Sequence, residues 1–157
     1  PQISVTAYLV RHAKAGDRDD WEGDDRLRPL SRPGVRQAEG LVQLLKDSRI
    51  GSVLSSPYLR CIQTVEPVAR HFGLRVEQER RLAEGAGGER VLQVIRARAG
   101  SNMVLCSHGD VIQDFLDRLA EEGLLPRKEL ALEKGSTWAV EEDQGRVVKA
   151  RYIPAPS

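Results

Sequence analysis

Apolar residues follow two patterns along this chain, short runs and stripes that repeat every three to four residues. Short apolar runs between turn residues favour strands buried in a sheet, at 4–10, 52–55, 74–78 and 103–106. The stripes predict amphipathic helices at 31–47, 57–71, 89–99 and 109–122. Strands therefore alternate with helices through most of the chain.

The last part of the chain follows a different pattern. Segments 136–140 and 146–153 alternate between apolar and polar residues, and Asp143-Gln144-Gly145 between them is typical of a hairpin turn. We therefore expect an α/β fold of three layers, α/β/α. Its central sheet should be mostly parallel, with helices on both faces and a C-terminal antiparallel hairpin. One domain is expected to cover residues 1–157.

Composition narrows the class of protein. Lys and Arg (24) nearly balance Asp and Glu (23), so the net charge of +1 provides no field that would attract a nucleic acid polymer or a membrane surface. No apolar run approaches the roughly 20 residues of a membrane-spanning helix. A cytoplasmic location and a monomer or weak dimer are the expectations. Cys61 and Cys106 are expected to be buried, reduced thiols. The sequence begins at Pro1 rather than at a methionine, which leaves open a domain of a longer protein.

Polar residues that could take part in catalysis follow three of the predicted strands. The first strand leads into Arg11 and His12, the second leads into a helix whose first turn carries Arg60, and the third leads into His108. Ligands of open α/β sheets bind beyond the carboxyl ends of the strands. If these strands are parallel neighbours, two histidines and two arginines should converge there.

Such a group suits phosphoryl transfer. A neutral imidazole can attack phosphorus, which divides one difficult displacement into two easier ones. Guanidinium groups, a second imidazole and helix N-terminal amides can hold the charge of the phosphoryl group without a metal. A leaving alkoxide also needs a proton. Glu84, in a glycine-rich loop, is the first candidate for this acid, and Asp110 is the second.

Each of these residues taken singly is more often a surface, capping or salt-bridge residue, so the hypothesis depends on their joint pattern. Competing motifs fail at named positions. A tyrosine-phosphatase loop on Cys106 would need arginine where Ile112 stands, and a nucleophile elbow around Ser107 would need glycine at Leu105. No HExxH, CxxC or Walker motif occurs, and neither a metal nor a cofactor is expected.

Four segments resemble the motifs of a known family in the family's order. They are LVRHA at 9–13, RPLS at 28–31 with Gly34, SSPYLR at 55–60 with Gln63 and Thr64, and SHG at 107–109. The family is the histidine phosphatase superfamily, also called phosphoglycerate mutase-like, and the resemblance spans roughly residues 5–115. Ala13 stands where the family usually has glycine.

This resemblance implies that His12 forms a phosphohistidine and that Arg11, Arg60 and His108 bind the phosphate. The short chain is most similar to the small SixA-type branch, which implies a phosphomonoester or a phosphohistidine protein as substrate. The stretches GDD at 23–25, RPL at 28–30 and KGSTW at 134–138 also resemble histidine-phosphatase domains fused to Nudix hydrolases in actinobacteria. This second resemblance implies nucleotide or diphosphate products as an alternative substrate. A non-catalytic phosphate-binding module is a further alternative. The region around Glu84 is compressed relative to the mutase-like branch, so its role as the acid stays open.

Overall fold

A computed structural model of the chain describes residues 4–126 and 130–157. Six strands form one sheet in the order β3-β2-β4-β1-β5-β6. Their bounds are β1 Val5–Arg11, β2 Ile50–Ser55, β3 Val76–Gln78, β4 Asn102–Ser107, β5 Thr137–Asp143 and β6 Arg146–Ile153. The first four strands pair in parallel, whereas β5 runs antiparallel to β1 and β6 antiparallel to β5. The predicted mostly parallel sheet with a C-terminal hairpin is confirmed.

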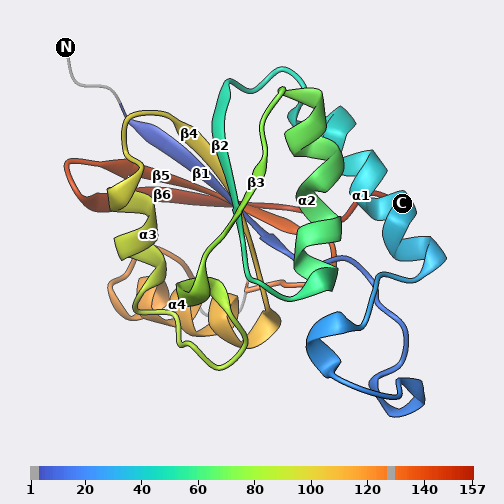
Figure 1. The fold of residues 1–157 in the computed structure, drawn as a ribbon. Helices are drawn as coiled ribbons and strands as arrows, with labels where there is room; N and C mark the ends of the chain where they lie inside the picture. Colours follow the sequence, from blue (N-terminus) through green and yellow to red (C-terminus); the bar gives the residue numbers. More distant parts are fainter. Residues whose placement is uncertain (1–3, 127–129) are drawn as a thin grey trace.

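Helices cover both faces of this sheet (Figure 1), which confirms the three predicted layers. Helices α1 and α2 lie on one side, and α3 and α4 lie on the other. Their bounds are α1 Arg32–Leu45, α2 Leu59–His71, α3 Val91–Ala97 and α4 Gly109–Glu121. Helix α2 begins two residues later than the sequence predicts, because Tyr58 has an extended backbone and acts as the N-cap.

Two apolar clusters separate the helices from the sheet. On the side of α1 and α2, Val10, Val104 and Cys106 pack with residues of both helices. On the side of α3 and α4, Leu9 and Leu105 pack with residues of those helices. Neighbouring residues of β1 and β4 thus enter opposite clusters, since side chains alternate across a strand. Continuous apolar runs in the sequence are the consequence of this double burial.

The hairpin turn places the end of the chain beside the first strand. Gln144 and Gly145 have φ values of 53° and 81°, the left-handed backbone that a two-residue hairpin turn requires. Pairing of β5 with β1 aligns Thr137 with Val10, so the segment that enters β5 lies beside the end of β1. The hairpin therefore contributes to the same sheet edge as Arg11 and His12.

The polar loop after β1 is ordered by local hydrogen bonds. Two short 3₁₀ helices, Arg18–Asp20 and Asp25–Leu27, are capped by the side chains of Asp17 and Asp24. A bridge between Ala15 and Leu30 closes the base of the loop. The loop is thus an ordered wall next to the carboxyl ends of the strands.

Two expectations from composition can be compared with this fold. Cys61 and Cys106 are buried free thiols, as predicted. Among the described residues, no helix is long and apolar enough to cross a membrane.

Candidate active site

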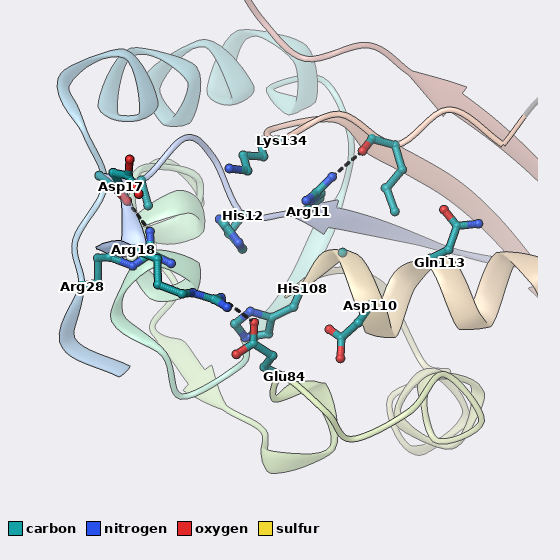
Figure 2. Close-up of a pocket in the computed structure, with 14 residues that line it drawn as sticks. Arg11, His12, Asp17, Arg18, Arg28, Glu84, His108, Asp110, Gln113 and Lys134 are labelled. Carbon is teal, nitrogen blue, oxygen red and sulfur yellow. Dashed lines mark hydrogen bonds and ion pairs between the residues drawn. The ribbon is translucent and has the colours of Figure 1, made fainter. Parts of the chain in front are cut away.

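A pocket of about 760 Å³ lies at the carboxyl ends of β1 and β4 (Figure 2). Its lining comes from the strand ends, the loop after β1, the start of α4 and the segment before β5. The lining residues are Arg11, His12, Ala15, Gly16, Asp17, Arg18, Arg28, Glu84, His108, Gly109, Asp110, Gln113, Leu132 and Lys134. The loop after β1 borders the pocket through residues at its two ends, from Gly16 to Arg18 and at Arg28.

His12 follows β1 directly, and its position is held by two hydrogen bonds. Its backbone N–H donates to the carbonyl oxygen of Ser107, at 3.0 Å. Its Nδ1 lies 2.8 Å from the carbonyl oxygen of Ala13. A carbonyl oxygen can only accept, so Nδ1 carries the proton and Nε2 of the neutral ring keeps its lone pair.

Burial keeps the His12 ring neutral. The pKa of His12 is lowered to about 3, chiefly by burial. The hydrogen bond to Ala13 raises this pKa, whereas the nearby His108, Arg60 and Arg11 lower it. The neutral form therefore persists as the pH falls from 7 towards 4. The ring is available as a nucleophile over that range.

We expect the folded protein to show a neutral His12 ring at all pH values between 7.5 and 4.5. Nitrogen NMR shifts of labelled histidine, assigned by loss of the signal in His12→Ala, measure this state directly. The same residue in the urea-unfolded chain should titrate near pH 6.5. A midpoint near 6.5 in the folded protein would contradict the expectation.

His108 is the N-cap of α4 and faces His12. The two rings are 5.5 Å apart between centroids and meet edge to face. His108 Nε2 lies 2.8 Å from the hydroxyl oxygen of Ser56 and 3.5 Å from Cys61 Sγ. The Tyr58 ring packs against it at 4.6 Å. The predicted convergence of the two histidines is thus present in the structure, and β2 and α2 provide the support for His108.

Arg11 lines the pocket beside the start of α4. Its Nη1 donates to the carbonyl oxygen of Leu132 at 2.6 Å, which anchors one edge of the guanidinium. The guanidinium also lies against Gly109. A Cβ atom at Gly109 would stand 2.9 Å from the Cζ of Arg11, so glycine is needed for this close approach.

Arg60 takes a different position from the other three residues. It is fully buried in the first turn of α2 and does not line the pocket. Its Nη1 donates to the backbone oxygen of Asp25 at 2.9 Å, and its Nη2 to the Asp25 carboxylate at 3.1 Å. The structure therefore places Arg60 behind the pocket wall, where the loop after β1 engages its guanidinium.

Both acids from the sequence lie in the pocket, on the same side as His108 (Figure 2). Glu84 Oε1 accepts a hydrogen bond from Arg18 at 3.1 Å and lies 3.7 Å from Nη2 of Arg60. Asp110 Oδ2 accepts from the backbone N–H of Gly85 at 2.8 Å. Both carboxyl groups therefore border the pocket, and each accepts a hydrogen bond there. In residues 4–126 and 130–157 no group of three or more His, Cys, Asp or Glu side chains is arranged to hold a metal ion.

Comparison with known families decides what this arrangement belongs to. The sequence model of the histidine phosphatase superfamily (branch 1) matches residues 7–90, more than half of the chain. The chain belongs to the histidine phosphatase superfamily. It is therefore a phosphatase domain, as the sequence motifs predict, and its fold is the one shared with the small SixA-type structures described next.

Three relatives place this histidine phosphatase within its family. An 8-oxo-(d)GTP phosphatase of Mycolicibacterium smegmatis is 33% identical over 99% of the chain, and the chain spans about half (50%) of that protein's length. A structure described as phosphohistidine phosphatase SixA from Agrobacterium tumefaciens is 25% identical, with a TM-score of 0.76 and coverage of 98% of this chain and 97% of that one. The protein histidine phosphatase SixA in complex with tungstate is 22% identical, with a TM-score of 0.75 and the same coverage.

Sequence reasoning missed three features of this histidine phosphatase site. They are the pairing of Asp25 with Arg60, the close approach of Gly109 to Arg11, and the presence of Lys134 in the lining. The SHG motif contains Gly109, so a signal was present there. Asp25 and Lys134 lie in stretches that resemble the Nudix-fused domains, but the resemblance gives them no role, and their roles depend on contacts with distant parts of the chain.

Gly109→Ala is expected to lower kcat/KM for p-nitrophenyl phosphate by about 10- to 100-fold, because the new methyl group displaces the Arg11 guanidinium from its place. The displaced atoms are the end of a flexible side chain, so the unfolding midpoint in urea should change little. Gly100→Ala is the matched control, since nothing lies within 4 Å of a Cβ there and Gly100 does not line the pocket. Equal activity of the two variants would show that the position of Arg11 is unimportant.

Proposed function

We propose that the chain hydrolyses a phosphomonoester or a phosphohistidine without a metal, through a covalent phosphohistidine at Nε2 of His12. The observation that carries this proposal is the hydrogen bond from Nδ1 to the Ala13 carbonyl, together with the low pKa of the ring. These leave a neutral, correctly oriented lone pair in the pocket. Nucleophilic catalysis needs that state of the imidazole.

The first step forms the N–P bond at His12 and breaks the bond from phosphorus to the leaving group. Glu84, Asp110 or solvent supplies the proton that the leaving atom takes. In the second step water attacks the phosphoryl group and gives a proton back to the group that donated one in the first step. The N–P bond breaks, and inorganic phosphate and neutral His12 are regenerated. A phosphohistidine substrate has a good leaving group, so it makes a weaker demand on the acid.

Charge on the transferred phosphoryl group is held by Arg11 and His108, which border His12. The N-terminal amides of α4 add partial positive charge, because helix N-termini favour anions. Arg60 contributes from behind the pocket wall through its field at His12, which the lowered pKa of His12 reflects. Preorganised cations of this kind stabilise the transition state, since they need no reorganisation during the reaction.

Two substrate classes follow from the relatives. The SixA-named structures suggest a phosphohistidine protein, whereas the 8-oxo-(d)GTP phosphatase suggests a small nucleotide or diphosphate product. The second class would fit a chain that acts within a longer protein, because the relative is about twice as long. In both cases the reacting group is a phosphoryl group, and the chemistry at His12 is the same.

A rapid-quench experiment with p-nitrophenyl phosphate tests the proposal. We expect a burst of one p-nitrophenol per active site and a phosphoryl adduct on His12 that is stable to alkali and labile to acid. Turnover should be insensitive to EDTA. A non-catalytic binding module would give no burst and no turnover, and loss of activity in EDTA would overturn the metal-independent step.

A further inference from the structure

We propose that Lys134 binds a second anionic group of the substrate, a phosphoryl or carboxylate group separate from the phosphoryl group that reacts at His12. This inference rests on the proposed function and adds a substrate class to it. The substrate would carry two anionic groups close to each other. Lys134 would then determine specificity, while His12 and its neighbours carry out the chemistry.

The backbone of Lys134 is held firmly against the reacting centre. The next residue, Gly135, donates its N–H to the carbonyl oxygens of both Arg11 and His12, at 3.1 Å each. The carbonyl oxygen of Lys134 accepts from Gln37 Nε2 at 3.1 Å. Gly135 has a φ of 86°, and a Cβ there would meet the Gln37 amide at about 3.0 Å. These contacts hold the backbone of Lys134 and Gly135 in one conformation beside the pocket.

The ammonium group of Lys134 differs from the other cations of the pocket because it has no partner within the described part of the chain. Arg18 is paired with Glu84 at 3.1 Å, and Arg28 with Asp25 at 2.9 Å. Lys134 instead extends into the pocket without a hydrogen bond or an ion pair to its side chain (Figure 2). A cation placed in this way can bind an external anion without first breaking an ion pair within the protein.

The arginines near this ammonium group are mostly paired with acids. The pKa of Lys134 is lowered first by burial and then by four arginines, Arg11, Arg28, Arg18 and Arg60. Three of them, Arg18, Arg28 and Arg60, form ion pairs with Asp25 or Glu84. An additional negative group of the substrate would therefore bind chiefly to Lys134, whose charge no described residue balances.

Lys134 lies near Arg11 but on the opposite side of His12 from the other groups that serve the reacting phosphoryl. Figure 2 shows Lys134 on one side of His12, and His108 and Glu84 on the other. A phosphoryl group on His12 is already flanked by Arg11 and His108. Lys134 is thus placed for a neighbouring group of the same substrate, such as the second phosphoryl of a diphosphate or a carboxylate near a phosphate ester.

Non-hydrolysable anions test this assignment independently of turnover. Methylphosphonate carries one anionic group, methylenediphosphonate carries two phosphonates, and phosphonoacetate carries a phosphonate and a carboxylate. We expect the wild-type protein to bind at least one of the two-anion probes about tenfold or more tightly than methylphosphonate, measured by calorimetry. A charged hydrogen bond has an effect of this order.

In Lys134→Met this preference should fall at least about tenfold, and Lys134→Arg should retain most of it. Lys46→Met, at the end of α1, is the matched control and should leave all three affinities unchanged. Preference for methylenediphosphonate would indicate a second phosphoryl group, and preference for phosphonoacetate a carboxylate.

Two results would overturn the inference. An equal loss of affinity for all three probes in Lys134→Met would show that the ammonium group binds the reacting phosphoryl group instead. An unchanged preference would show that Lys134 binds neither group. Failure of p-nitrophenyl phosphate turnover in the wild-type protein would refute the proposed function, while the binding measurement would still decide the role of Lys134.

Discussion

His12→Ala is expected to lower kcat/KM for p-nitrophenyl phosphate by at least about 10⁴-fold, because loss of a covalent nucleophile removes the reaction path itself. The remaining arginine and histidine can still bind the phosphate, so binding of methylphosphonate should persist. Steady-state kinetics and a burst assay on the purified variant measure the two effects. No phosphoryl adduct should form.

The fold should survive this substitution. Within residues 4–126 and 130–157 the His12 side chain makes a single hydrogen bond, to the adjacent Ala13, and the ring borders the pocket. We expect the free energy of unfolding to change by no more than about 2 kcal/mol in a urea titration. His71→Ala, at the exposed end of α2, is the matched control for loss of an imidazole. Wild-type turnover in a folded His12→Ala protein would refute the covalent mechanism.

Arg11→Lys is expected to lower kcat/KM by about 10²- to 10³-fold, the range seen when one preorganised oxyanion donor is removed. The guanidinium can bond to the Leu132 carbonyl through Nη1 and still present other N–H groups to a phosphoryl group. A lysine ammonium is a single point and cannot hold both partners in this planar geometry. Single-turnover kinetics measure the loss in the phosphorylation step.

Arg96→Lys provides the control for this exchange. Arg96 also donates to a backbone carbonyl, that of Gly145, but it lies at the hairpin turn rather than in the pocket. Its substitution should leave kcat/KM unchanged. A loss in kcat/KM of less than about threefold in Arg11→Lys would contradict this expectation. It would show that a positive charge suffices and that the several planar N–H donors of the guanidinium have no role.

The candidate site was only partly predictable from the sequence. The motif spacing correctly indicates that Arg11, His12 and His108 line one pocket, because each lies at or just after a strand end and parallel strands end at one edge. Arg60 follows a strand end too, yet it does not line the pocket. The motif places its backbone correctly, but the direction of its guanidinium is set by Asp25, which belongs to a loop without periodicity.

By itself, the sequence determined the order of the elements, the two-sided burial of the sheet and the family of this phosphatase. These properties follow from periodic burial and from short motifs, and both are local along the chain. Only the tertiary structure decided how Arg11 is anchored, how Arg60 is engaged and why the Lys134 side chain has no partner among the described residues. Those contacts join residues 121 positions apart for Arg11 and Leu132, and 35 apart for Arg60 and Asp25. They exist only after the sheet has brought its strand ends together, so a local pattern cannot encode them.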